Sequence, residues 1–111
     1  MTVTAKNLIP AKVAEATQTT QYTAVNVTTI IDKFTATNFS ASSATISVNL
    51  VTYTDTAGDR NLITKTKSLG ASEVYTFPEL VGQILSPNSF ISTIAGTASA
   101  INIRVSGREI S

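Results

Sequence analysis

Cysteine, histidine and tryptophan are all absent from the 111 residues of this chain. Without Cys, the chain has no disulfide framework, no thiolate metal ligand and no cysteine nucleophile. Without His, it lacks the commonest general base and the commonest metal ligand. Every standard catalytic triad or metal constellation therefore lacks a member. We expect a protein that is not an enzyme, with no catalytic residue, no cofactor and no metal site.

Charge is scarce as well. Only 14% of the residues are charged, and eight Lys and Arg face seven Asp and Glu, for a formal net charge of +1. This balance is too close to neutral to favour phosphate backbones, so we expect no nucleic-acid partner. No run approaches the ~18 apolar residues of a membrane-spanning helix, and the first ten residues have no apolar core of signal-peptide length. We therefore expect no membrane partner and synthesis in the cytoplasm of the producing cell.

β-Branched residues are abundant instead. The chain has 19 Thr, 11 Ile and 9 Val, and 12 Ser add to the number of hydroxyl side chains. β-Branched side chains are stiff at χ1 and pack well on a pleated surface. With 42% apolar residues, a chain of this length can bury a core of its own. The composition predicts one all-β domain.

Alternating apolar and polar residues place the strands of that domain. The predicted strands cover residues 25–39, 44–53, 61–69, 73–77, 89–95 and 98–106. Turn residues recur between them about every ten positions, the spacing of a sandwich or a jelly roll. We predict a single antiparallel β-domain over residues 21–111, either a sandwich or a jelly roll.

The alternation also predicts which side chains face the core. In the strand 44–53, the predicted inward residues are Ile46, Val48 and Leu50. In the strand 25–39, Ile30, Phe34 and Ala36 share one face, and the opposite face holds Thr29, Ile31, Lys33 and Thr35.

Two segments depart from the strand pattern. Pro78 suits the first position of a helix, and Leu80, Val81, Ile84 and Leu85 form a helical stripe, so we predict one short helix over about residues 78–85. Residues 1–20 are polar and contain Pro10, which forbids a regular helix through it. We expect them to form an N-terminal arm that packs along the domain or a neighbour, so that removal of residues 1–16 leaves the sandwich folded.

A few motifs suggest chemistry, and each has a plainer interpretation. Asp55 and Asp59 could hold a hard cation, but calcium takes six to eight oxygens and a turn with Asx hydrogen bonds is the preferred interpretation. A Ser-Lys pair could form from Ser68 with Lys65 or Lys67, but a solvated strand face is the preferred interpretation of these residues.

Two further groups of residues are candidate sites. Asn26-Val27-Thr28 and Asn38-Phe39-Ser40 match the glycosylation sequon, but without a secretory signal we do not expect them to be glycosylated. Arg104, Arg108 and Glu109 form either an interface cluster or a set of solvated charges at a strand end.

Four segments carry a resemblance to a known family. They are residues 61–67 (NLITKTK), 75–85 (YTFPELVGQIL), 30–38 (IIDKFTATN) and 103–109 (IRVSGRE). Over about residues 22–111, the chain resembles the small outer-capsid decoration proteins of tailed bacteriophages, which are also called staple or cement proteins. The motifs are strings of structural residues, so the resemblance assigns no binding residue.

The resemblance implies a jelly-roll β-sandwich that forms a homodimer on the outer capsid surface of the virion. There it clamps neighbouring copies of the major capsid protein of the same phage. Hydroxyl-rich, charge-poor faces suit such a role, because Ser and Thr can pair with a neighbour or with water. The alternative is a phage tail or receptor-binding β-domain that recognises a host surface glycan, which would favour an exposed aromatic patch.

Overall fold

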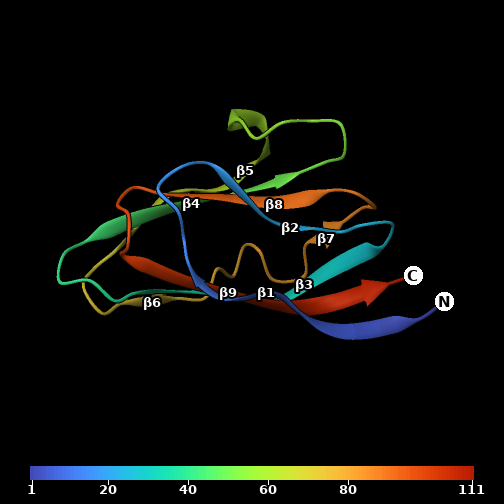
Figure 1. Ribbon diagram of the computed structural model, residues 1–111, viewed down its shortest axis with the longest axis horizontal. Coiled ribbons are helices and arrows are strands. Elements are labelled where there is room, and N and C mark those ends of the chain that lie inside the picture. Colours follow the sequence, from blue (N-terminus) through green and yellow to red (C-terminus); the bar gives the residue numbers. More distant parts are fainter.

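The computed structural model describes residues 1–111, which fold into two antiparallel β-sheets packed face to face (Figure 1). Sheet A has the strand order β1-β9-β3-β6, and β7 also pairs with β3; sheet B has the order β2-β8-β4-β5. The strands of sheet A are β1 (Val3–Val13), β3 (Thr28–Asn38), β6 (Val74–Tyr75), β7 (Ile84–Leu85) and β9 (Ile101–Ile110). The strands of sheet B are β2 (Thr19–Thr23), β4 (Ala44–Val51), β5 (Leu62–Leu69) and β8 (Phe90–Ala95).

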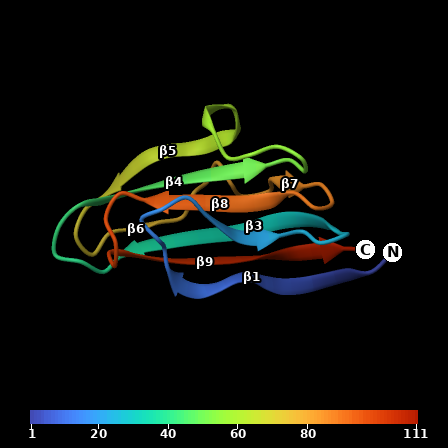
Figure 2. The same cartoon turned by 45° about the horizontal axis from the view of Figure 1, so that its top comes forward.

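Most connections cross from one sheet to the other, as the colours of Figure 2 show along the chain. β1, β3 and β9 lie in sheet A, whereas β2, β4 and β8 lie in sheet B. This alternation is the order of a jelly roll, with β6 and β7 sharing the edge position beside β3. The predicted all-β, jelly-roll-like antiparallel sandwich is confirmed.

The two sheets enclose one core of 21 buried apolar residues. Phe34 of β3 packs on Phe77 with a centroid separation of 4.5 Å, and Phe77 in turn contacts Tyr75 at 4.6 Å. On β4, Ile46 and Val48 are fully buried, as predicted. Leu50 packs against the same core and is partly exposed at its margin.

The predicted faces of β3 are correct only beyond a bulge. The pairing with β9 shifts between Ile31 and Lys33, which leaves Asp32 as an extra residue. Because one extra residue reverses the alternation, Ile31 is fully buried and Ile30 faces outward, the reverse of the prediction. Thr29 is likewise buried rather than outward, while Phe34 and Ala36 face the core as expected.

Gly107 of β9 lies opposite this bulge. A Cβ atom at Gly107 would come within 2.2 Å of the backbone oxygen of Ile30 and within 2.7 Å of a Leu8 methyl carbon. The close approach of β3 and β9 at this point therefore requires glycine, for space rather than for a special backbone angle.

The predicted helix over residues 78–85 is wrong. Residues 78–82 form turns, and the chain then pairs with β3 as β7. The backbone turns at Phe77, with φ of 46°, and at Gly82, with φ of 85°, and Gly82 N donates to Ile31 O at 2.7 Å. The apolar stripe divides accordingly: Leu80 and Leu85 are buried, whereas the other two members, Val81 and Ile84, are exposed.

Residues 1–20 are part of the sandwich rather than a separate arm. β1 pairs with β9 along its length, with two register shifts around Pro10. Its Leu8 and Ile9 are buried in the core, and β2 already begins at Thr19. The expectation that the sandwich folds without these residues is therefore inconsistent with the structure.

Candidate functional site

The loop that holds Asp55 and Asp59 is organised by hydrogen bonds and one long ion pair. The Asp55 carboxylate accepts from Thr56 N at 2.9 Å and lies 3.8 Å from the Arg60 guanidinium. Asp59 begins the short 3-10 turn η1 (Asp59–Asn61) and is exposed. No group of three or more acidic side chains with metal-binding geometry occurs in the chain. The loop is a turn held by local side-chain hydrogen bonds. The bond to Asp55 comes from the next residue, whereas in an Asx turn it comes from two residues on.

The other sequence motifs are not assembled into a site. No hydrogen bond joins Ser68 to Lys65 or Lys67; the Lys67 amine lies 4.7 Å from the ring centroid of Tyr75 instead. Of the two sequon residues, Asn38 is fully buried and its amide donates to Ser42 O and Leu69 O. A glycan could not be attached to Asn38 in the folded protein.

The loop of residues 52–61, which connects β4 to β5, lies over part of the outer face of sheet B (Figure 1). Asn49 of β4 lies beneath this loop, only 2% exposed. Its amide donates to Gly58 O at 2.9 Å and to Asn61 Oδ1 at 2.6 Å, and its oxygen accepts from Gln18 at 3.3 Å. The buried Asn49 thus anchors the loop to the sheet without changing the register predicted for β4.

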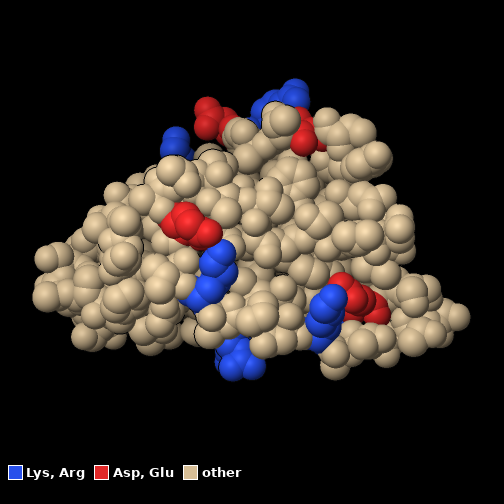
Figure 3. All heavy atoms as spheres, viewed as in Figure 1, with Lys and Arg blue, Asp and Glu red and all other residues tan.

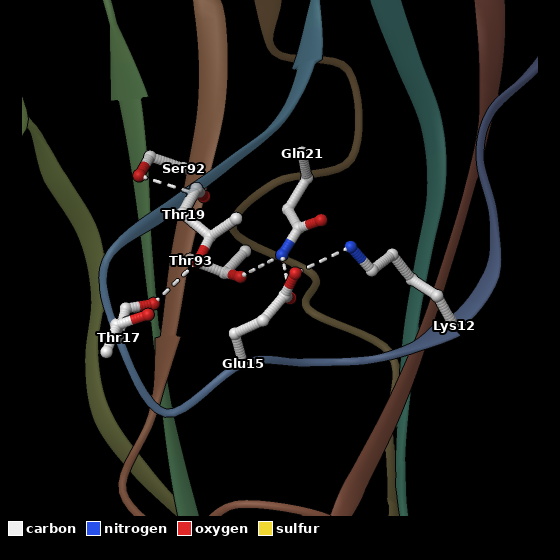
Figure 4. A network of polar contacts seen from close by, with 7 residues as sticks. All are labelled: Lys12, Glu15, Thr17, Thr19, Gln21, Ser92 and Thr93. Atoms are coloured by element: carbon white, nitrogen blue, oxygen red, sulfur yellow. Dashed lines mark hydrogen bonds and ion pairs between the residues drawn. The ribbon is translucent and has the colours of Figure 1, made fainter.

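A second polar network closes the gap between β1 and β2 (Figure 4). Glu15 accepts from Lys12 and from Gln21, each at 2.9 Å, and the Gln21 amide also donates to Thr93 Oγ1 at 3.0 Å. The hydrogen bond from Gln21, with that from Lys12, lowers the pKa of Glu15 below its ordinary value. The sequence showed only a polar run here. Lys12, Glu15 and Gln21 are close in the chain, but the contact of Gln21 with Thr93 depends on the pairing of β2 with β8.

Two tyrosine–glutamate contacts join the sheets. In the first, the Tyr22 hydroxyl of β2 donates to Glu109 of β9 and lies 2.7 Å from Thr29 Oγ1 of β3. Lys6 lies 3.3 Å from the same carboxylate. The hydrogen bond from Tyr22, with help from Lys6, lowers the pKa of Glu109. Burial, together with the neighbouring carboxylate, raises the pKa of Tyr22 to about 12.

In the second contact, Tyr75 of β6 donates to Glu79 at 2.6 Å, and Thr64 of β5 donates to the other carboxylate oxygen. Burial would raise the pKa of Glu79, but the two hydrogen bonds outweigh it, so the pKa is lowered. The bond to Glu79 raises the pKa of Tyr75 to about 12. Both contacts join sheet A to sheet B through hydrogen bonds, and we interpret them as structural contacts.

The residues Arg104, Arg108 and Glu109 do not form one cluster. Arg108 makes a bidentate ion pair with Asp32, with N–O distances of 2.9 to 3.2 Å. Glu109 points between the sheets toward Tyr22, whereas Arg104 is exposed and has no hydrogen bond or ion pair. The three residues therefore have separate surroundings, and Arg104 alone among them lacks a partner.

Arg104 stands on the uncovered outer face of sheet A. On β9, Ile101, Ile103 and Val105 are buried, so the residues between them face outward. No segment covers this side of the sheet (Figure 1). We call this surface the outer face of sheet A; its central side chains are Asn7, Thr35, Thr37, Asn102, Arg104 and Ser106.

Exposed aromatic side chains do not gather on any face. Phe39 and Tyr53 are 50% and 61% exposed. Phe39 follows β3, and Tyr53 follows β4, which runs antiparallel to it toward the opposite end of the sandwich (Figure 2). The two rings therefore do not form the aromatic patch that a glycan-binding domain would favour.

No helix in the chain has the length and apolar character to span a membrane. Comparison with known proteins finds no matching family model, no matching curated protein and no matching solved structure.

Proposed function

We propose that this protein is a non-catalytic structural protein of a phage virion, which binds the outside of an assembled capsid and clamps neighbouring major capsid proteins. The resemblance over residues 22–111 motivates the proposal. The observation that supports it best is the uncovered outer face of sheet A, where hydroxyl, amide and small side chains cover a regular sheet. Such side chains can be desolvated against a partner and can bond to it directly or through water.

The size of this face suits a protein–protein interface. Four strand positions about 4.8 Å apart and about ten residues of 3.3 Å give roughly 600 Å². A standard interface buries about 800 Å² on each partner. Weak contacts of this size become effective on a shell, because symmetry repeats each of them over many copies.

Sedimentation with capsids tests the proposal. Purified protein is mixed with bare shells of the phage, or with free major capsid subunits, and the bound copies are counted after sedimentation. We expect saturable binding to shells and none to free subunits, because a clamp recognises a junction that exists only after neighbours meet. Absence of binding to shells would overturn the proposal.

The proposal includes a homodimer, which the resemblance implies. Light scattering coupled to size exclusion should give a mass near twice the 11.7 kDa of the chain. If the protein is monomeric at all concentrations up to about 100 μM, the proposed homodimer is wrong and single copies bind the shell.

A further inference from the structure

We propose that the outer face of sheet A is the surface that binds the partner, and that the partner presents carboxylate side chains to Arg104 and Lys33. This inference rests on the proposed function, since the partner is a subunit of the shell. It adds which face binds, which residues anchor it and what chemistry the partner must offer.

Two of the four sheet edges, β1 and β5, are poorly suited to partner binding by strand addition. β1, the long edge of sheet A, carries Lys6, Pro10 and Lys12 and is broken by two register shifts. β5, the edge of sheet B, carries Lys65 and Lys67 and is also irregular. Lysine, proline and bulges are the features by which edge strands avoid pairing with other chains.

The outer face of sheet B is partly occupied by the chain itself. The loop 52–61 lies over it, and Asn49 and Val51, which alternate with the core residues of β4, are buried beneath or beside that loop. Sheet A has no such cover, and Figure 1 shows its outer side open along β1, β9 and β3. The open face is therefore that of sheet A.

Unpaired charge on this face has one sign. Arg108 is neutralised by Asp32 through its bidentate ion pair. Arg104 and Lys33 are exposed and have no acidic or aromatic partner. Lys33 is paired with Ser106 and Thr35 with Arg104 in the β3–β9 ladder, so both cations project from adjacent rows of the same face. On the side of the molecule seen in Figure 3, charged side chains are few and widely spaced.

Small side chains leave Arg104 accessible from both sides. One hollow beside it is lined by Ala5, Asn7, Ser106 and Gly107 together with Lys6 and Asp32, which are paired with Glu109 and Arg108. The second is lined by Ala11, Thr35, Thr37, Asn102 and Ile103 and holds no charged side chain besides Arg104. A carboxylate that enters the second hollow can meet the planar guanidinium with two parallel hydrogen bonds. Arginine in such surroundings is a frequent energetic centre of protein interfaces.

Charge-reversal variants with a matched control test the inference. Arg104→Glu and Lys33→Glu are compared with Lys65→Glu, which makes the same change in net charge on β5 of the other sheet. Far-UV circular dichroism first verifies that each variant is folded. We expect Arg104→Glu to raise the half-saturation concentration for shells at least ~30-fold and Arg104→Gln ~10-fold, because a buried carboxylate is left unpaired. Lys65→Glu should stay within ~2-fold of the unmodified protein.

Amine footprinting gives a second, independent readout. Lys33 and Lys65 are both exposed, so acetylation should modify both in the free protein. On shells, Lys33 should become protected and Lys65 should remain reactive.

The two proposals can fail separately. If the unmodified protein does not bind shells, the proposed function fails. If it binds and Arg104→Glu weakens binding no more than Lys65→Glu, or Lys33 stays reactive in the bound state, the assignment of the outer face of sheet A is overturned while the proposed function stands.

Discussion

Replacing Gly107 with Ala should destabilise the sandwich severely. The added Cβ would lie 2.2 Å from the Ile30 oxygen, whereas such contacts are essentially never shorter than 3.0 Å, so β3 and β9 would have to separate by about 0.8 Å. This separation weakens ladder hydrogen bonds that are each worth about 1 kcal/mol. The 2.7 Å approach to Leu8 adds overpacking, which costs about 1–3 kcal/mol.

We therefore expect Gly107→Ala to lose about 3–5 kcal/mol of unfolding free energy, a large share of the 5–15 kcal/mol of a typical domain. The thermal midpoint should fall by at least ~12 °C, at ~4 °C per kcal/mol. Denaturant unfolding followed by far-UV circular dichroism measures the loss. Tyrosine fluorescence provides a second probe, since the chain has no Trp.

Gly58→Ala is the matched control. A Cβ at Gly58 meets no atom within 4 Å, and its φ of −171° is extended backbone that any residue adopts. We expect this variant to remain within ~1 kcal/mol of the unmodified protein. If the two variants unfold at the same denaturant concentration, β3 and β9 do not approach each other as closely as the structure indicates.

Three further predictions concern the loop, the sheet contacts and β1. Asn49→Ala should cost about 1–3 kcal/mol in denaturant unfolding, as much as a core truncation, and should make the loop 52–61 more sensitive to protease, because its buried anchor is lost. Glu109→Gln should be less stable than the unmodified protein at pH 7, and the difference in unfolding free energy should shrink as the pH falls below 4.5. The reason is that the pKa of Glu109 is lower in the folded than in the unfolded protein. The stability that this difference contributes is present above the pKa of the unfolded state and is lost as the pH falls through the pKa of the folded state. Deletion of residues 1–13 should leave a chain without cooperative thermal unfolding, because burial of Leu8 and Ile9 alone contributes about 3–6 kcal/mol; a sharp transition would contradict this.

The sequence predicted where three strands lie. The predictions over 44–53, 61–69 and 89–95 match β4, β5 and β8 to within two residues at each end. Ile46 and Val48 face the core as expected, since the pairing of β4 with β8 has no register shift. The pairing of β4 with β5 has two register shifts, so local periodicity gave the position of β5, whereas its register depends on its partner strand.

The errors arise where the backbone departs from regular geometry. The bulge at Asp32 reversed the predicted faces of Ile30 and Ile31, and nothing in the residue types marks it. Two register shifts around Pro10 hid β1 in the same way. The apolar stripe of residues 80–85 suggested a helix, but a turn followed by a short strand buries two of its four members, Leu80 and Leu85, without a helix.

The candidate site was only partly accessible from sequence. Arg104 could be named as an exposed charge at a strand position. The sequence could not show that Arg104 lacks an acidic partner. The nearby Asp32 pairs instead with Arg108, which lies 76 positions away in the chain. Such long-range pairing is a property of the tertiary structure and leaves no local signal.

The central place of β9 in sheet A has a consequence for biosynthesis. β9 is translated after the other eight strands, yet it lies between β1 and β3 and supplies the long ladder of each. At about 5–20 residues per second, the end of β3 is made on the order of 4–14 s before the end of β9. The β1–β9 and β3–β9 ladders therefore cannot form before β9 emerges, whereas the short pairings of β3 with β6 and β7 can. Until β9 is available, the lysines and the proline of β1 hinder the pairing of this unpaired strand with other chains.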